Sequence, residues 1–329
     1  METLKFGVLG TAQIGINSVI PGLQKSNYCQ VKAIASRTLE KAQQAAEQLN
    51  IKKSYGLYED LLSDDEIEAV YIPLPNHLHV PWSIKALQAG KHVLCEKPVA
   101  LNTREVEELQ RAVESSNGLK CMEAFMYRFH PQWRHVKEII NSGKIGKIRS
   151  LYSTFTYHNT DPENIRNKYA EGGGGLMDIG CYCISTSRFL LNMEPDKVVG
   201  ELKYDSDFNI DNHGNCLMDF ADKTASFIYG TQQYRQQEVV IHGTQGKIII
   251  DQPFTPPADE KINIYLVQDG NTKTIEINPA DQYRLQADEF ARSIIDNNPL
   301  AYSLQDSYNN MKVIDALFES SKKGEWVML

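Results

Sequence analysis

Hydrophobic positions in the first third of the chain follow two alternating patterns. Short apolar runs rich in β-branched residues have the length of buried strands, and longer amphipathic segments lie between them. The predicted strands are Leu4–Leu9, Val31–Ala35, Ala69–Ile72, His92–Cys95 and Leu119–Met122. The predicted helices cover residues 14–25, 39–49, 80–89 and 103–116, with Thr103 as the N-cap of the last. Strands that alternate with helices predict βαβ units and a doubly wound, mostly parallel sheet.

Beyond residue 125 the pattern changes to closely spaced strands. The candidates are Ile148–Tyr157, Gly214–Phe220, Thr224–Thr231, Glu238–His242, Lys247–Ile250, Ile262–Val267 and Thr272–Ile277. Helices are expected over residues 131–141, 284–297 and 304–321. Strands that follow one another without helices predict a mostly antiparallel sheet. We therefore expect an α/β protein with one domain over residues 1–122 and a second over 123–329, whose C-terminal helix packs back on the first.

Composition and charge narrow the class of protein. The 329 residues favour about two domains, and 42% hydrophobic residues can form large cores. Lys and Arg number 34 against 42 Asp and Glu, and this net charge of −8 argues against nucleic acid as a partner. No apolar stretch resembles a signal peptide or a membrane span, so we expect a cytoplasmic protein without a membrane partner. The six cysteines lack C-x-x-C spacing, so no metal site is expected.

A glycine-rich turn follows the first predicted strand. The segment 10–15, Gly-Thr-Ala-Gln-Ile-Gly, matches G-x-G-x-x-G with alanine at the second glycine. Small residues there permit a tight turn, a close approach of backbone N–H groups to a pyrophosphate, and close packing of helix on strand. A turn without a ligand is the alternative, but the position between strand and helix favours a dinucleotide. Cofactor contacts are predicted at Gly10, Thr11, Ala12, Ile14 and Gly15.

The end of the second predicted strand bears on the choice between NAD and NADP. An NAD site usually has Asp or Glu there for the ribose 2′-hydroxyl, whereas this chain has Ser36 and Arg37. These side chains suit a 2′-phosphate through charge-assisted hydrogen bonds. In the alternative, Arg37 is only a solvated loop charge. We predict NADP as the preferred cofactor, with NAD as the second choice.

Two further motifs carry candidate chemistry. Glu96-Lys97-Pro98 ends a predicted strand, which places Lys97 at the carboxyl edge of the parallel sheet. Much later in the chain, the glycine run 172–175 leads into a predicted helix. Asp178 and Tyr182 are four residues apart on that helix and so share one face.

In this order, the motifs resemble the glucose–fructose oxidoreductase / inositol dehydrogenase (Gfo/Idh/MocA) family along essentially the whole chain. The resemblance rests on the turn at 10–15, on Leu-Pro-Asn-His-Leu-His at 74–79, on Glu-Lys-Pro at 96–98, on Met122–Arg128 and on Gly173–Tyr182. Tyr182 stands where inositol dehydrogenase-like members have histidine. The chain is therefore most similar to the dimeric dihydrodiol dehydrogenases and NADP-dependent xylose dehydrogenases.

The resemblance implies an N-terminal Rossmann domain and a C-terminal domain that binds substrate. It implies an NAD(P)-dependent oxidoreductase that acts on an aldose, polyol, keto sugar or trans-dihydrodiol, and a homodimer or homotetramer formed through the second sheet. Tyr182 is the candidate general acid/base. A free tyrosine has a pKa of about 10, and a cation within about 4–6 Å lowers it by roughly 1–3 units. Lys97 is expected to supply that charge.

Other residues of these motifs are candidates for supporting roles. Asp178 is a further candidate catalytic residue. Asp178 and Arg128 are candidates for substrate contact, although Asp178 also suits a helix N-terminus and Arg128 also suits an ion pair at the domain junction. The alternative role for Tyr182 is that of a core tyrosine. The alternative role for His79 is that of a capping residue. Further cofactor contacts are predicted at Leu74, Asn76, His79, Glu96 and Lys97. The alternatives for Glu96 are that it orients Lys97 or only ends the strand.

Two other function classes stay open on the sequence. An NAD-dependent glycoside hydrolase would hold its cofactor tightly and use a transient oxidation to assist elimination. A non-catalytic nucleotide sensor would bind the dinucleotide and regulate another protein. The presence of both Lys97 and Tyr182 favours the oxidoreductase over the sensor.

Overall fold

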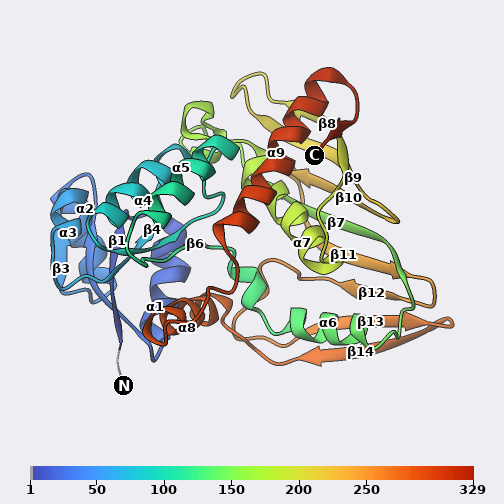
Figure 1. The fold of residues 1–329 in the computed structure, drawn as a ribbon, viewed down its shortest axis with the longest axis horizontal. Helices are drawn as coiled ribbons and strands as arrows, with labels where there is room; N and C mark the ends of the chain where they lie inside the picture. The colour runs from blue at the N-terminus through green and yellow to red at the C-terminus, as the bar shows by residue number, and fades with distance from the viewer. Residues whose placement is uncertain (1–2) are drawn as a thin grey trace. The chain divides into compact units, whose positions relative to one another are not determined.

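The structure, a computed structural model, describes residues 3–329, and its chain path is shown in Figure 1. The chain forms two compact units. The first contains the residues up to 129 together with 281–308, and the second contains 130–280 together with 309–329. The predicted division after residue 122 is contiguous in sequence, whereas the first unit also includes residues 281–308. Among residues 3–329, no helix has both the length and the apolar character that crossing a membrane requires.

The first unit contains the predicted doubly wound sheet, which the structure confirms. Its strands pair in parallel in the order β3-β2-β1-β4-β5-β6. They are β1 Leu4–Leu9, β2 Cys29–Ala35, β3 Lys53–Tyr55, β4 Ala69–Ile72, β5 His92–Cys95 and β6 Cys121–Glu123. The chain passes from β3 across β1 to β4, so the order reverses beside β1. Crevices at such a reversal are where doubly wound sheets bind their ligands.

Helices cover both faces of this sheet, with α1 and α8 on one side and α4 and α5 on the other (Figure 1). The rings of Phe6 in β1 and Phe290 in α8 lie 6.1 Å apart in the core. The helices are α1 Ile20–Lys25, α2 Leu39–Gln48, α3 Tyr58–Leu62, α4 His79–Gln88, α5 Thr103–Glu114 and α8 Gln282–Ile295. The prediction of Thr103 as N-cap is wrong, because the side chain of Asn102 accepts the Glu105 N–H and caps α5.

The second unit contains the predicted mostly antiparallel sheet, which is also confirmed. Its order is β14-β13-β12-β11-β7-β10-β9-β8-β15, and β7 with β10 is the parallel pair. The strands are β7 Ile148–His158, β8 Lys197–Tyr204, β9 Asp211–Phe220, β10 Lys223–Gly230, β11 Gln232–Gly243, β12 Lys247–Ile250, β13 Ile262–Gln268, β14 Asn271–Ile277 and β15 Val327–Met328. β8 and β15 lie outside the predicted strands.

One face of this sheet is covered by helices α6 Gln132–Asn141, α7 Cys181–Leu191 and α9 Leu304–Lys323, the last of which begins in the first unit. The strands alternate accordingly: Ile248 and Ile250 of β12 are fully buried, and Ile249 between them is partly exposed. Successive side chains of a strand point to opposite faces. The face that carries Ile249 is therefore the one that the helices leave open.

Candidate active site

The glycine-rich turn of the first unit lies in the crevice beside β1. Gly10 has a backbone φ of +127°, which side chains other than glycine rarely adopt, and its N–H donates to the carbonyl of Ala35 at 2.9 Å. A Cβ added at Gly15 would lie 3.5 Å from the ring of Tyr71 in β4, so helix and sheet approach closely there. Thr11, Ala12 and Ile14 are partly exposed. This arrangement fits a dinucleotide pyrophosphate.

The end of β2 offers a cation and no carboxylate. Ser36 is 4% exposed and its N–H donates to the carbonyl of Tyr55 at 3.1 Å, whereas the side chain of Arg37 is exposed. Burial raises the pKa of Tyr58 above its ordinary value, and the charge of Arg37 opposes that rise. The guanidinium of Arg37 thus acts electrostatically on the first residue of α3. A positive group at this point fits the predicted 2′-phosphate.

Lys97 follows β5 at the carboxyl edge of the same sheet. Its peptide bond to Pro98 is cis, and its side chain is partly exposed. The carboxylate of Glu96 accepts the Tyr71 hydroxyl at 2.7 Å and the Lys97 N–H at 3.3 Å. Glu96 therefore connects the end of β5 to β4 and fixes the backbone of the lysine. This contact supports an orienting role for Glu96, one of the alternatives that the sequence left open.

His79 is part of the scaffold that holds this edge. Its side chain is 1% exposed, and its two ring nitrogens lie 2.7 Å from the carbonyl oxygens of Pro98 and Leu74. Burial lowers the pKa of His79 to about 4, against the two carbonyl contacts, which raise it. Because both ring nitrogens contact the protein, the structure favours the structural alternative, and contact of this side chain with the cofactor stays a prediction. His79 instead links the 74–79 loop to the segment of Lys97.

Arg128 belongs to an ion pair within the first unit. Its side chain is 7% exposed, and Nη1 lies 2.8 Å from the carboxylate of Asp306. The guanidinium also lies 4.6 Å from the ring centre of Tyr302. The structure therefore shows the ion pair, one of the two roles that the sequence allowed, and contact of Arg128 with substrate stays a prediction. Asn76 and Leu74 lie in the loop after β4, where Asn76 is partly exposed and Leu74 is buried.

The second unit places Asp178 in a cluster that the sequence did not indicate. One oxygen of its carboxylate lies 2.9 Å from Nε of Arg166, and the other accepts the hydroxyl of Tyr157 at 2.6 Å. Asp178 is 7% exposed. The charge of Asp178 raises the pKa of Arg166, and burial together with that charge raises the pKa of Tyr157. Asp178 is thus held as a carboxylate between a cation and a phenol.

The glycine run before this helix is shaped by a second buried acid, Asp211. Gly174 has a φ of +125°, and an added Cβ would overlap the Asp211 carboxylate. That carboxylate accepts the N–H of Leu176 at 2.6 Å and the hydroxyl of Tyr229 at 2.7 Å. Burial raises the pKa of Asp211 to about 6, and these two hydrogen bonds oppose the rise. Asp211 therefore binds the first turn of the helix that carries Asp178.

Tyr182 lies in an aromatic pocket one turn after Asp178. It is 4% exposed, and the rings of Phe155 and Phe254 each lie 5.5 Å from it in edge-to-face orientation. The helix opens with a π turn over Leu176–Gly180 before α7 begins. π turns of this kind occur often at functional sites. The aromatic contacts fix the ring, so the core role and a catalytic role are compatible.

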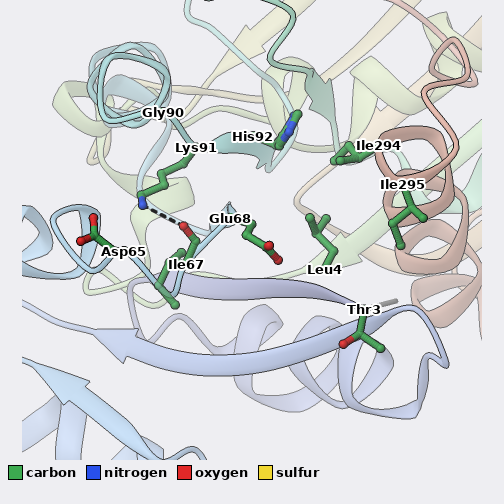
Figure 2. A pocket seen from close by; sticks show the side chains of 10 residues that line it. All are labelled: Thr3, Leu4, Asp65, Ile67, Glu68, Gly90, Lys91, His92, Ile294 and Ile295. Atoms are coloured by element: carbon green, nitrogen blue, oxygen red, sulfur yellow. Dashed lines mark hydrogen bonds between the residues drawn. The ribbon is translucent and has the colours of Figure 1, made fainter. Parts of the chain in front are cut away.

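A pocket of about 450 Å³ opens at the opposite, amino-terminal edge of the first sheet (Figure 2). Lys91 extends into this region and donates to the carbonyl of Ile67 at 2.7 Å and of Asp64 at 2.9 Å, so its charge is used within the protein. Nucleotides bind at the carboxyl edge of such sheets. The pocket is therefore not the cofactor site.

Within residues 3–329, no three His, Cys, Asp or Glu side chains gather as metal ligands.

The sequence predicted the motif residues but missed the residues that position them. Arg166, Tyr157 and Asp211 come from segments far from Asp178 and match no short motif. The one available signal was the glycine run itself, since several adjacent glycines indicate a backbone pressed against other groups.

The family follows from sequence comparison. Residues 4–125 match the Gfo/Idh/MocA oxidoreductase family with an NAD-binding Rossmann fold, and residues 133–249 match the Gfo/Idh/MocA C-terminal domain. The chain belongs to this family and is an NAD(P)-dependent oxidoreductase. The predicted family, fold class and enzyme class are thereby confirmed.

Relatives align along nearly the whole chain. An uncharacterized oxidoreductase of Rhizobium meliloti is 42% identical over 99% of both chains. An NADP-dependent D-xylose 1-dehydrogenase of Haloferax volcanii is 35% identical over 99% of this chain and 100% of its own. The crystal structure of a 3-ketoreductase from Actinomadura kijaniata, in complex with NADP and TDP-benzene, has a TM-score of 0.93 at 30% identity, covering 97% of this chain and 98% of that chain.

Proposed function

We propose that the chain transfers hydride between a nicotinamide and the carbinol or carbonyl carbon of an aldose, polyol, keto sugar or trans-dihydrodiol. The observation that carries the proposal lies within the first unit. Lys97 follows β5 at the same carboxyl edge of the sheet as the Gly10–Gly15 turn. A lysine at that edge is suited to act beside the reactive end of a bound dinucleotide.

The residues present fit a dinucleotide in the following way. The turn 10–15, with Gly10, Thr11, Ala12, Ile14 and Gly15, would hold the pyrophosphate, and Ser36 with Arg37 would hold a 2′-phosphate. Leu74, Asn76 and Glu96 are proposed as further contacts. When bound, the nicotinamide supplies the hydride chemistry. The absence of a carboxylate after β2 supports NADP over NAD, as does the NADP dependence of the xylose dehydrogenase relative.

The protein's own task is to move a proton and orient a carbon. In the oxidising direction, Tyr182 takes the hydroxyl proton of the substrate as the hydride leaves its carbon, and it returns the proton in reduction. Lys97 favours the phenolate and hydrogen-bonds the substrate oxygen. Both oxygens of Asp178 are already engaged by Arg166 and Tyr157 within the second unit, which argues against Asp178 as the group that takes the proton. Its proposed role is to position a substrate hydroxyl.

A plate of aldoses, polyols and diols with NAD⁺ or NADP⁺ tests the substrate class. We expect the absorbance of reduced nicotinamide to rise with at least one substrate, and faster with NADP⁺. Sugar release from an added aryl glycoside without net reduction would instead identify a glycoside hydrolase. Binding of NADP(H) without turnover of any compound would identify a sensor.

The role of Lys97 has its own test. Lys97→Met removes the ammonium and keeps much of the side chain's length, so turnover should fall by at least a thousandfold, which is about 4 kcal/mol of transition-state stabilisation. Binding of NADPH, measured by fluorescence, should persist. Near-normal turnover in this variant would remove Lys97 from the mechanism.

A further inference from the structure

Three titratable side chains of the second unit belong to the segments around Tyr182. Asp178 lies one turn earlier on the same helix, Arg166 lies before the glycine run, and Tyr157 is in β7. The rings packed on Tyr182, Phe155 of β7 and Phe254, do not titrate. An isolated Asp178 carboxylate would oppose formation of a second negative charge on the nearby phenol.

The guanidinium of Arg166 offsets the negative charge of the Asp178 carboxylate. Its Nε lies 2.9 Å from the carboxylate of Asp178. The side chain of Arg166 is 39% exposed, whereas the side chain of Asp178 is 10% exposed. The other contact of its guanidinium within residues 3–329 is a long one, 3.5 Å from Nη1 to the side-chain oxygen of Asn164. A negative charge on Tyr182 adds to the influences of Asp178 and Tyr157 that raise the pKa of Arg166. The guanidinium and the Tyr182 phenol therefore interact electrostatically.

The glycine run holds this arginine in place. The carbonyl of Arg166 accepts the N–H of Gly174 at 3.0 Å, and its own N–H donates to the side chain of Asn164 at 3.1 Å. A Cβ at Gly173 would overlap the Arg166 carbonyl. The same loop that leads into the helix of Asp178 and Tyr182 thus fixes the backbone of Arg166.

We propose that Arg166 is a positioning residue for the acid/base Tyr182: it holds Asp178 in an ion pair and so favours the phenolate form of Tyr182. Arginine suits this task because it stays protonated at every working pH. In this arrangement the second unit carries its own cation for the tyrosine. The inference rests on the proposal that Tyr182 is the acid/base group.

The test is a direct titration of Tyr182, which needs no substrate. Phenolate absorbance is followed against pH in the full-length protein, and the curve of the matching Tyr182→Phe protein is subtracted to isolate one tyrosine. In Arg166→Gln the midpoint should rise by about 1 pH unit or more, because Asp178 is left uncompensated. In Asp178→Asn it should fall. Arg166→Lys should lie between the wild type and Arg166→Gln.

Arg134→Gln is the matched control, since Arg134 is an exposed arginine of the same unit and its loss changes the net charge equally. It should leave the midpoint unchanged. An unchanged midpoint in Arg166→Gln with a native circular dichroism spectrum would overturn the proposal. If that variant does not fold, a midpoint that fails to fall in Asp178→Asn overturns it equally. A substrate panel without turnover, or a normal kcat in Tyr182→Phe, would contradict the proposed function. The effect of Arg166 on the titration of Tyr182 can still be measured in that case.

Discussion

The nearly buried charged side chains of this protein differ in whether a neighbouring residue compensates their charge. Arg128 is 7% exposed in its side chain and pairs with Asp306, so its charge is compensated within the first unit. Glu123, at the end of β6, is a different case. One of its oxygens accepts the N–H of Val99 at 2.9 Å, and the other has no hydrogen-bond partner among residues 3–329. Such a carboxyl is costly in its charged form.

Glu123 should make the stability of the protein depend on pH. Burial raises the pKa of Glu123 to about 7, against the hydrogen bond from the Val99 N–H. The folded state therefore binds a proton that the unfolded chain, with a glutamate pKa of about 4.3, has released. This contribution to stability is complete below about pH 4 and is lost as the pH rises through 7. Glu123→Gln keeps the neutral form, so its free energy of unfolding at pH 8 should exceed that of the wild type by on the order of 1 kcal/mol.

Urea unfolding at pH 5 and pH 8 measures this difference. The advantage of Glu123→Gln should shrink at pH 5, where the wild-type carboxyl is already protonated. The matched control is Glu289→Gln, because Glu289 is an exposed glutamate on α8 of the same unit. An equal difference between Glu123→Gln and wild type at both pH values would contradict the argument.

Arg37 should set the preference between the two dinucleotides. It is the exposed cation at the end of β2, where no carboxylate competes for a 2′-phosphate. Charge-assisted hydrogen bonds contribute about 1.5–3 kcal/mol, so Arg37→Ala should weaken NADPH binding roughly ten- to hundredfold and leave NADH binding nearly unchanged. Nucleotide fluorescence measures both. Arg104→Ala, which removes an exposed arginine of α5, should change neither. Equal loss for both nucleotides would point to a structural role for Arg37.

At the scale of elements, the start of the Asp178 helix depends on one buried acid. Asp211 accepts the Leu176 N–H and the Tyr229 hydroxyl, and each would lose its acceptor in Asp211→Ala. Burying two unsatisfied donors should lower the free energy of unfolding by about 2–4 kcal/mol. Tyr229→Phe removes one donor and keeps the bond to Leu176, so it should cost less than half as much. Urea unfolding of both variants compares them, and equal losses would show that the helix bond contributes little.

The strength of local signals explains which elements the sequence could predict. Strand β4 and strand β5 match their predicted bounds because continuous apolar runs mark them. β8 alternates buried and exposed residues with lysine and glutamate on the open side, so its apolar signal is weak. Asn102 rather than Thr103 caps α5, since neighbouring residues of similar capping preference cannot be ranked without the backbone. The π turn before α7 has no known sequence signal.

The candidate site likewise contains residues that a local sequence motif marks and residues that only the fold brings together. Lys97 and Tyr182 belong to motifs, so the sequence singled them out as candidates, and their roles stay predictions. Arg166 and Tyr157 reach Asp178 only through folding, because β7 and the 164–175 segment are brought together by tertiary packing. His79 was placed in the right loop, but its contacts with the carbonyls of Pro98 and Leu74 join two segments that only the fold brings together. Contacts of this kind leave no periodic pattern along a chain.

At the scale of the whole molecule, the open face of the nine-stranded sheet is the surface through which we expect copies of the chain to associate. Residues paired across neighbouring strands form an apolar row on this face. Ile249 of β12 pairs with Tyr265 of β13 and with Val240 of β11, and Val240 pairs with Tyr152 of β7. Each of these four side chains is partly or fully buried, but no helix of the second unit covers this side of the sheet. Extended apolar surfaces of this kind mark interaction sites.

We therefore expect a homodimer or homotetramer that uses this face, and Ile249 tests it. Ile249→Glu places a charge in the middle of the apolar row, where burial against a second copy would be costly. Its particle mass by light scattering should fall to that of one chain, with native circular dichroism retained. Lys273→Glu introduces the same side chain at an exposed position of the edge strand β14 and should keep the wild-type mass. A wild type that is already monomeric, or an Ile249→Glu protein of unchanged mass, would exclude this face as the interface.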